Sequence, residues 1–300
     1  MNKRRANHVL AIVLNWQQPR VTLACVDTLS QMNGQEPDIL IIDNGSQDDS
    51  LNIFCANKGG FKLSALPQNT GFATGINHGL RMALEEGYDF ALMVNNDAFA
   101  DARMLEQLLL EAAPDIALLS PKIFYEKEPD RIWFANGRQH PITLDLLDTG
   151  KGELDGPKWQ NSHDVDYLLG TCLLVNLDAV REVGLLDERY YFYFEDLDWS
   201  LRFRRAGYRL RVAAGAHLYH RVALSTGGAE DSPLRRYHLA KSSVRFWHRN
   251  AGYGWPWAIF IFRALSAVKT VARLHATGHH NAARAYVRGL RDGWRESKMD

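Results

Sequence analysis

The sequence predicts an α/β fold, in which residues 1–234 form a domain with a mostly parallel central sheet and residues 235–300 form a helical extension. Two observations carry this prediction. Short apolar runs alternate with helix-patterned segments through residues 1–120, which indicates β–α–β units with helices on both faces of a sheet. Beyond residue 235, apolar side chains such as Trp255, Ile259 and Phe262 recur at helical spacing.

The first half of the chain is predicted element by element from apolar runs and turn residues. Residues 8–16 form a continuous apolar run, typical of a strand buried on both faces, and Pro19 opens a helix through Met32. Residues 38–43 predict the second strand, which stops at Asn44-Gly45. The same alternation then predicts helices at residues 50–58, 73–86 and 103–113 and strands at residues 61–66, 90–94 and 116–120.

The second half of the domain is less regular. Residues 124–165 are rich in Gly, Pro and Asp, so we expect a loop-rich insertion there. Beyond it, the residue pattern predicts a strand at Val165–Val175, helices at Leu177–Val183 and Glu195–Ala206, and a final strand at Arg209–Val212.

Composition bounds the class of protein. Apolar residues make up 46% of the chain and charged residues 23%, which permits an ordinary buried core and excludes wholesale disorder. Cys25, Cys55 and Cys172 form no C-x-x-C pair, so we expect neither a disulfide framework nor a zinc site. The apolar segment at residues 9–14 is too short for a secretory signal, and no stretch reaches the ~20 apolar residues of a membrane span. We therefore expect a cytoplasmic protein.

The charge is unevenly distributed, although the formal net charge is zero. Residues 235–300 contain 13 Lys and Arg against three Asp and Glu, while residues 1–234 contain 22 against 32. A basic segment of this kind favours an anionic partner. Because its basic residues are interleaved with Trp, Phe and Ile, a membrane surface fits better than a nucleic acid, and the protein would lie peripherally on the inner face of the cell membrane. The alternative is a pair of helices packed on the domain with a solvated basic face.

Polar residues lie at the predicted carboxyl ends of the strands, where such sheets bind their ligands. Asp43 has the chemistry to bind a nucleobase or ribose, although Asp is also common in turns. Gly71 permits close approach of the backbone to a ligand, and the helix that follows offers N–H groups to phosphate. The fourth strand ends in hard oxygen ligands suited to Mg²⁺ or Mn²⁺, namely Asn95, Asn96 and Asp97.

The densest group of acids follows an aromatic segment. Residues 190–194 are all aromatic, and Glu195, Asp196 and Asp198 come directly after them at the start of a predicted helix. The N-terminal end of a helix keeps acids ionised, as a general base requires, but acids are also favoured there for stability alone. His217 and His220 follow the predicted last strand and are candidate partners for a metal site.

Together, these segments resemble the family-two glycosyltransferases with a GT-A (Rossmann-like) fold, especially their bacterial rhamnosyltransferase-like branch. The matching segments occur in family order and span most of residues 8–225. They are VLNW (13–16), IIDNGSQDDS (41–50), QNTGFATGINHGL (68–80), VNNDAF (94–99), residues 168–210 and His220. A single motif of this kind is a weak signal, whereas the ordered set is specific.

The resemblance implies a role for each matching residue. Asp43 would contact the base or ribose with Asn15 close by, and the rest of the nucleotide-sugar pocket would include Asn69, Gly71 and Asn77. Asn95-Asn96-Asp97 stands where the family has its D-x-D motif, with Asn95 in place of the first Asp. Asp97 would therefore bind the metal and the diphosphate.

The other two implied roles concern the acids and histidines further along the chain. Asp196 resembles the catalytic base. His220 resembles the residue that completes the metal site, with His217 as the less favoured alternative.

The implied reaction is inverting transfer of a sugar from a nucleoside-diphosphate donor to a glycan or lipid-linked acceptor, with residues 124–165 near the acceptor. The branch favours L-rhamnose from dTDP-rhamnose in bacterial cell-surface polysaccharide synthesis, although UDP-linked sugars use similar motifs. A non-catalytic nucleotide-sugar-binding scaffold is the main alternative, supported by Asn95. The presence of Asp97, Asp196 and His220 favours catalysis, because a scaffold needs no base. We disfavour a nucleotidyltransferase, since no Gly-rich basic loop near the N-terminus would bind a triphosphate.

Overall fold

The computed structural model describes residues 7–57, 59–221 and 231–298. Its strands are β1 (Val9–Asn15), β2 (Asp38–Asp43), β3 (Phe61–Ala65), β4 (Phe90–Asn95), β5 (Ala98–Ala100), β6 (Ile116–Tyr125), β7 (Glu128–Phe134), β8 (Asn136–Gln139), β9 (Leu146–Thr149), β10 (His163–Asp164), β11 (Cys172–Asn176) and β12 (Arg209–His220). Its helices are α1 (Pro19–Ser30), α2 (Ser50–Ala56), α3 (Phe72–Glu85), α4 (Met104–Leu110), α5 (Leu177–Val183), α6 (Glu195–Arg205), α7 (Pro233–Asn250), α8 (Pro256–Ala276) and α9 (His280–Glu296), with 3₁₀ turns at Pro157–Trp159 and Ala251–Tyr253.

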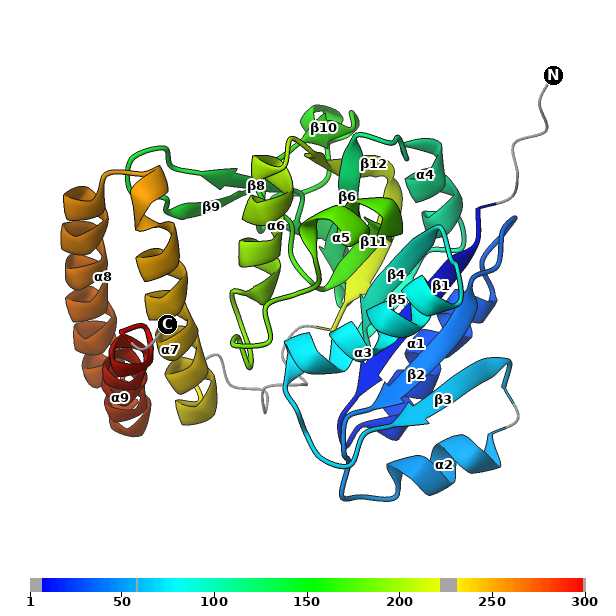
Figure 1. The fold of residues 1–300 in the computed structure, drawn as a ribbon, viewed down its shortest axis with the longest axis horizontal. Helices are drawn as coiled ribbons and strands as arrows, with labels where there is room; N and C mark the ends of the chain where they lie inside the picture. The colour runs from blue at the N-terminus through cyan, green and yellow to red at the C-terminus, as the bar shows by residue number, and fades with distance from the viewer. Residues whose placement is uncertain (1–6, 58, 222–230, 299–300) are drawn as a thin grey trace.

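One large sheet runs through the molecule in the order β10–β12–β6–β11–β4–β1–β2–β3, with β5 and β7 paired to β12 and β6 (Figure 1). β1 pairs in parallel with β2 and β4, β2 with β3, and β6 with β12. β11 is antiparallel to both of its neighbours, β4 and β6. The α/β fold with a mostly parallel sheet is therefore confirmed.

The central strands form because their apolar runs are buried on both faces. Residues 9–13 of β1, 39–42 of β2 and 91–94 of β4 are buried along their whole length. A run of this kind, without alternation of polar residues, needs helices on both sides of the sheet. The helices between these strands supply that cover, and their buried residues join the strands in one core.

The register of the parallel strands gathers polar residues at one edge. Asn15 at the end of β1 is the register partner of Asp43 at the end of β2. Asn95, at the end of β4, pairs with Leu14, one residue before Asn15. Parallel strands place their carboxyl ends together, so three predicted site residues from distant parts of the chain become neighbours.

The structure differs from three sequence predictions about the second half. Residues 124–165, predicted as a loop-rich insertion, contain β7 to β10 and the end of β6 between their loops. The strand predicted at Val165–Val175 begins only at Cys172, since the backbone N–H groups of Val165 and Leu168 bond instead to Leu210 and the Ser200 hydroxyl. The final strand continues to His220 rather than ending at Val212, because it pairs with both β5 and the extended end of β6.

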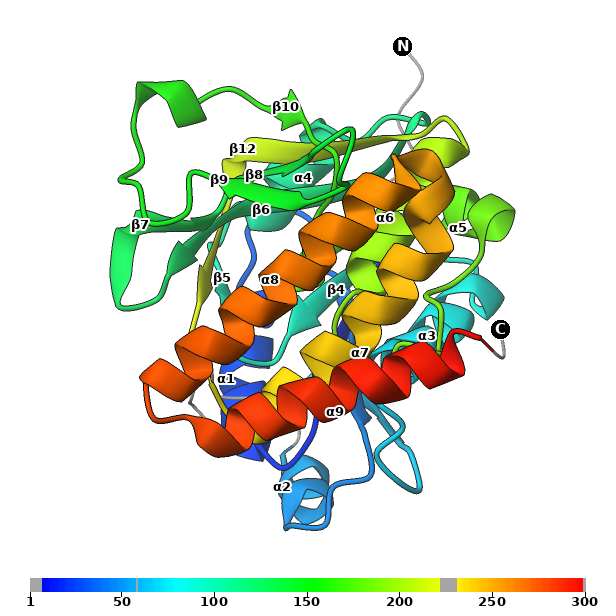
Figure 2. The same ribbon diagram turned by 90° about the vertical axis from the view of Figure 1, so that its left-hand side faces the viewer.

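The C-terminal extension is helical, as predicted, and packs as a layer against the sheet domain (Figures 1 and 2). α9 crosses α7 closely, and a Cβ on Gly289 would lie 2.3 Å from the Tyr237 carbonyl oxygen. Phe246 and Trp247 of α7 belong to the core of the sheet domain, while Ala240 shares a second, smaller core with α8 and α9. Within the described residues, no helix combines the length and apolar character needed to cross a membrane. The domain boundary at residue 234 stays a prediction.

Candidate active site

A chain of hydrogen bonds links the ends of β1, β2 and β4. Asn96 Nδ2 donates to Thr22 Oγ1 at 3.1 Å, and Thr22 Oγ1 donates to Asn15 Oδ1 at 2.7 Å. Asn15 Nδ2 in turn donates to Asp43 Oδ1 at 2.7 Å. The chain therefore connects the predicted metal-binding strand end with the predicted nucleotide-binding one. Thr22 is a site-organising residue that the sequence pattern did not reveal, because it lies inside an ordinary helix.

Asp43 also shapes the turn after β2. Its Oδ2 accepts the Ser46 backbone N–H at 3.0 Å, and its Oδ1 accepts the Ser46 hydroxyl at 2.6 Å. The carboxylate is only 1% exposed. Both of its oxygens thus hold the loop in place, and the predicted contact of Asp43 with a base or ribose stays a prediction.

Position 71 requires glycine because another segment of the chain packs closely against it. Its φ of +86° lies in the left-handed region, and a Cβ there would sit 2.5 Å from the Tyr191 carbonyl oxygen. The same oxygen accepts the Phe72 N–H at 2.9 Å, while the Tyr191 hydroxyl donates to Asn69 Oδ1 at 3.1 Å. The Phe72 N–H at the start of this helix, which was expected to be free for phosphate, is therefore hydrogen-bonded to the aromatic segment.

Asn77 lies within α3 and is almost fully buried. Its Nδ2 donates to the Leu186 carbonyl and to Glu188 Oε1, both at 2.9 Å, and its Oδ1 accepts the Leu186 N–H at 3.1 Å. Asn77 therefore ties α3 to the loop that precedes the aromatic segment. In this structure its amide holds that loop, and direct contact with a sugar nucleotide remains a prediction.

Asp97 and His220 come together because β5 and β12 pair, with Ala98 opposite His220. His220 Nε2 lies 3.2 Å from Asp97 Oδ1. Both side chains are buried, and neither Asp97 Oδ1 nor His220 Nδ1 has a hydrogen-bond partner among the residues that the structure describes. The His220 ring packs edge-on against Trp133 of β7, with their centroids 4.5 Å apart. Trp133 is a second residue that the sequence analysis did not single out.

The chemistry of Asp97 and His220 fits a divalent cation. A buried carboxylate oxygen without a donor is costly unless something satisfies it, and a cation would do so. Mg²⁺ typically takes one or two carboxylates, several waters and substrate phosphates, so a small protein donor set is sufficient. Among the described residues, no group of three or more His, Cys, Asp and Glu side chains could hold a metal ion. The assignment of Asp97 and His220 as metal ligands stays a prediction.

Backbone strain marks the entry to the acidic helix. Tyr193 and Phe194 have φ values of 69° and 71°, although bulky residues rarely adopt the left-handed region. Phe194 is held by its ring contact with Phe246 of α7, at a centroid distance of 5.1 Å. Such strain persists only where the surroundings enforce it, and it is common at functional sites. Here it sets the direction in which Glu195 and Asp196 leave the loop.

The three acids of this helix have different surroundings. Asp198 is buried and pairs with Arg202 Nε at 2.8 Å, so it is structural. Asp196 is half-buried, and its two oxygens each accept one backbone N–H, from Gly170 and Leu197, both at 2.8 Å. Burial raises the pKa of Asp196 above its ordinary value, and these backbone bonds oppose that rise. Each oxygen keeps a lone pair for a further donor.

Residues 170 and 171 connect the acid to the end of β4. The Gly170 N–H donates to Asp196 Oδ2, and the carbonyl of the following residue, Thr171, accepts the Asn95 N–H at 2.9 Å. Two sites separated by about a hundred residues in sequence are therefore joined through two adjacent residues. This connection relates the position of the predicted base to that of the predicted metal ligands.

The segment predicted as an insertion adds a further carboxylate to this region. Asp148 of β9 has a buried Oδ1 for which the described part of the chain offers no hydrogen-bond partner, and burial raises its pKa to about 6. Burial also raises the pKa of Tyr167, with smaller contributions from the charges of Asp148 and Asp196. His217 Nε2, by contrast, lies 3.2 Å from the Ala214 carbonyl oxygen, and its ring packs against Phe124.

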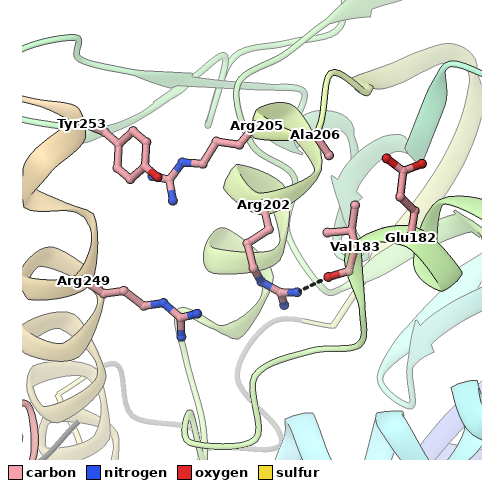
Figure 3. Close-up of a pocket in the computed structure, with 7 residues that line it drawn as sticks. All are labelled: Glu182, Val183, Arg202, Arg205, Ala206, Arg249 and Tyr253. Carbon is pink, nitrogen blue, oxygen red and sulfur yellow. Dashed lines mark hydrogen bonds between the residues drawn. The ribbon is translucent and has the colours of Figure 1, made fainter.

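A cavity of about 410 Å³ lies elsewhere, at the other end of α6 (Figure 3). Each of its three arginines already contacts another group of the protein. Arg202 pairs with Asp198 and donates to the carbonyls of Val183 and Leu185. Arg249 pairs with Asp187, and the Arg205 guanidinium lies over the Tyr253 ring. Asp196 is nine residues before Arg205, about 14 Å along the helix. This cavity is therefore separate from the candidate active site.

Comparison with known proteins supports the same interpretation. A rhamnosyltransferase of Mycobacterium tuberculosis, described as N-acetylglucosaminyl-diphospho-decaprenol L-rhamnosyltransferase, is 28% identical over 70% of this chain and 75% of its own length. The dTDP-rhamnosyl transferase RfbF of Shigella flexneri is 17% identical over 81% of both chains. The fold is similar to that of a mannosyltransferase from Pyrobaculum calidifontis in complex with GDP-Man and Mn²⁺, with a TM-score of 0.60, 13% identity, and coverage of 97% of this chain and 88% of that one.

Two family models cover most of the catalytic region. The model of glycosyl transferase family 2 matches residues 11–164, about half of the chain, and that of glycosyl transferase family group 2 matches residues 92–278. The matches include the ends of β1, β2 and β4 and the acidic helix described above. With the GT-A-like fold and the gathered strand-end residues, they identify the chain as a glycosyltransferase that belongs to glycosyl transferase family 2.

Proposed function

We propose that this glycosyltransferase moves L-rhamnose from dTDP-rhamnose to a lipid-linked or glycan acceptor in polysaccharide synthesis, with inversion at the anomeric carbon. The observation that carries the mechanism is the connection through residues 170 and 171, which joins Asp196 to the strand that leads to Asp97. The relatives' names support the sugar, because both are described as rhamnosyl transferases. Their names also support a donor activated by dTDP and an acceptor that carries a lipid diphosphate.

In the proposed reaction, Asp196 acts as the general base. It accepts the proton of the acceptor hydroxyl while the acceptor oxygen forms a bond to the anomeric carbon. The bond from that carbon to the diphosphate breaks, and the nucleoside diphosphate leaves with the electron pair. A raised pKa suits this role, since a base is most effective when its pKa approaches the working pH. The backbone donors from Gly170 and Leu197 fix the carboxylate orientation.

Asp97 and His220 would hold a Mg²⁺ or Mn²⁺ ion, whose charge, when bound, offsets the negative charge that develops on the diphosphate. Asn95 and Asn96 line the same strand end, and Asn96 is held by Thr22. Asn95 replaces a carboxylate of the family motif, so it contributes at most a neutral oxygen. Asp97 is then the main source of negative protein charge on the cation.

The nucleotide would lie along the ends of β1 and β2. Asn15 and Asp43 would form its base and ribose side, because they sit at adjacent strand ends. Asn69 and Gly71 would border the sugar, since their loop contacts Tyr191 next to the acidic helix. Asn77 would contribute through the loop that it anchors at Leu186 and Glu188.

The decisive experiment is a donor panel with purified protein, Mn²⁺ and a lipid-diphosphate-linked N-acetylglucosamine acceptor. We expect transfer from dTDP-rhamnose, with an anomeric configuration in the product opposite to that of the donor, read by nuclear magnetic resonance. General-base catalysis contributes about 10²–10⁴-fold, so Asp196→Asn should reduce turnover by about that factor while donor affinity changes little.

Three outcomes would contradict the proposal. Preferred transfer from a UDP-sugar would refute the donor assignment, and a retained configuration would exclude the inverting mechanism. Donor binding without turnover on any acceptor would favour the non-catalytic scaffold. As a matched control, Asp198→Asn removes a buried ion pair with Arg202 and should lower stability rather than abolish chemistry at the anomeric carbon.

A further inference from the structure

The outward side of α8 is an apolar face that no part of the described chain covers. Phe260, Leu265 and Val268 are 67%, 65% and 67% exposed, respectively. At about 100° per residue, the exposed apolar side chains of this helix fall on a single face. They are Trp257, Phe260, Ile261, Leu265 and Val268.

The opposite side of α8 is already used for packing. Ile259 and Leu274 are buried, and Arg263 lies over the Trp247 ring, with its guanidinium carbon 4.9 Å from the ring centroid. The helix therefore has one apolar side that docks on the protein and another that faces outward. A soluble surface helix needs only the first of these.

α9 presents a row of arginines beside this face. Arg284, Arg288, Arg291 and Arg295 are all exposed, and their spacing of four, three and four residues places them on one side of the helix. The other side of α9 packs on α7 through Gly289 and Gly293. Glu296 pairs with Lys241 and Arg245 of α7, so it does not offset the charge of the row. Asp292 lies 3.8 Å from Arg291 and offsets part of its charge, and the Arg288 guanidinium lies over the Tyr237 ring of α7. The row therefore carries a net positive charge.

An open apolar groove joins the two helices. It has a volume of about 390 Å³ and is lined from α8 by Ala267, Val268, Val271 and Ala272 and from α9 by Val287 and Leu290. Figure 2 shows α8 and α9 as the frontmost layer of the molecule, with α7 behind them. The apolar face of α8, the groove and the arginine row of α9 lie on these two neighbouring helices, and we call them together the α8–α9 surface.

We propose that the α8–α9 surface binds an anionic membrane, with the apolar side chains of α8 in the headgroup boundary and the arginines of α9 against lipid phosphates. An amphipathic helix with bulky apolar residues and an adjacent basic row is the pattern of a helix that lies in a membrane interface. The two contributions to membrane binding add, since burial of apolar side chains and attraction to anionic lipid act independently.

The arginine row argues against the other occupants of such a surface. Two-fold pairing of two copies through this face would bring the arginine rows near each other without an acidic partner. A nucleic acid would use the arginines but would leave Phe260, Leu265 and Val268 exposed to water. A membrane with anionic lipid satisfies both the apolar face and the charge.

The test is flotation of the full chain with two kinds of vesicle. We expect the protein to float with equimolar phosphatidylcholine–phosphatidylglycerol vesicles and to stay unbound with phosphatidylcholine alone. The triple variant Arg284→Glu, Arg291→Glu, Arg295→Glu should bind anionic vesicles at least about 100-fold more weakly, since each basic residue near such a surface contributes about five-fold. The double variant Phe260→Ser, Leu265→Ser should also lose binding, through the apolar contribution.

The control variant carries the same charge change elsewhere on the surface. Arg20, Arg103 and Arg138 are exposed and lie on α1, before α4 and on β8, so Arg20→Glu, Arg103→Glu, Arg138→Glu should bind vesicles like the wild type. All three variants change exposed residues and should keep the wild-type melting temperature. Equal binding by the triple variant and its control would overturn the proposal. So would a dimer in sedimentation that the Phe260→Ser, Leu265→Ser change dissociates, without vesicle binding by the wild type.

Discussion

Glu195 and Asp196 are adjacent in the chain, but their carboxyl groups have different surroundings. Asp196 accepts two backbone N–H groups, whereas Glu195 Oε2 is buried and has no hydrogen-bond partner within residues 7–57, 59–221 and 231–298. Burial, followed by the charge of Asp196, raises the pKa of Glu195 well above its ordinary value. The two acids therefore differ: the carboxylate of Asp196 is oriented by backbone donors, as the proposed base requires, and Glu195 holds its proton to a higher pH than an exposed glutamate does.

We expect Glu195→Gln to stabilise the protein, and to do so more strongly as the pH rises. A raised pKa means that the folded state keeps a proton that the unfolded chain loses, so stability is highest below the ordinary value of 4.5 and falls as the pH rises through the folded pKa. A Gln side chain does not titrate, so the variant does not lose this stability as the pH rises. For a loss of about 1 kcal/mol, the variant melts about 2–4 °C above the wild type at mildly alkaline pH.

Thermal melts of both proteins across a pH series provide the measurement. Glu106→Gln is the control, because Glu106 is exposed on α4 and should show no pH-dependent difference from the wild type. A difference between Glu195→Gln and the wild type that stays constant from acidic to alkaline pH would refute the assignment.

At the scale of elements, α7 supports both the active site and the outer helices. On one side, Ser242 Oγ donates to the Phe192 carbonyl at 2.8 Å, and Phe246 packs on Phe194. On the other side, α9 lies close against it at Gly289 and Gly293. The strained turn before the acidic helix therefore depends on a helix from the C-terminal extension.

Gly289→Ala should destabilise the protein, although alanine is the better helix former. A Cβ at Gly289 would lie 2.3 Å from the Tyr237 carbonyl oxygen, so α9 must move away from α7. Overpacking of this kind costs about 1–3 kcal/mol, whereas Gly→Ala in an uncrowded helix gains up to about 1 kcal/mol. We expect a melting temperature lower by roughly 2–10 °C.

Gly252→Ala is the matched control, since a Cβ at Gly252 meets no atom within 4 Å. That variant should melt at or slightly above the wild-type temperature. If Gly289→Ala were as stable as Gly252→Ala, the close crossing of α7 and α9 would be refuted.

At the scale of the whole molecule, the candidate active site draws its residues from several distant segments of the sheet domain. Asn15, Asp43 and Asn95 come from three parallel strands, His220 from the other side of the sheet, and Asp196 from a helix. A ligand that contacts all of them binds only the folded protein, so it should stabilise the fold by mass action.

dTDP should therefore raise the melting temperature, and a divalent cation should be needed for most of that effect. At a ligand concentration of about 100 times Kd, the gain is about 2.7 kcal/mol, which corresponds to roughly 5–11 °C. Excess EDTA should remove most of the shift, because Asp97 and His220 alone leave the diphosphate charge uncompensated.

Asp97→Ala should lose the metal-dependent part of the shift while it folds like the wild type without ligand. Asp27→Ala, at an exposed position of α1, should keep the full shift. A full shift in EDTA would contradict the metal-assisted binding of the donor.

Local sequence pattern was sufficient for the fold class, for the first strands and helices, and for the candidate residues at strand ends. A strand buried on both faces requires consecutive apolar residues, and its end requires turn residues, so β1, β2 and β4 are visible in the sequence itself. The family resemblance added an expected role for Asp97, Asp196 and His220, and the structure brings Asp97 and His220 together.

Only the tertiary structure decided how these residues are connected. The extension of β12 to His220, the role of Thr22 between Asn96 and Asn15, and the peptide link through residues 170 and 171 all depend on pairings between distant segments. The strands within residues 124–165 were missed for the same reason. They lack the continuous apolar run that marks a strand buried on both faces, and they form by pairing with other strands. The local pattern of apolar residues shows which face of a segment will be buried. It does not show which distant segment will pack against that face.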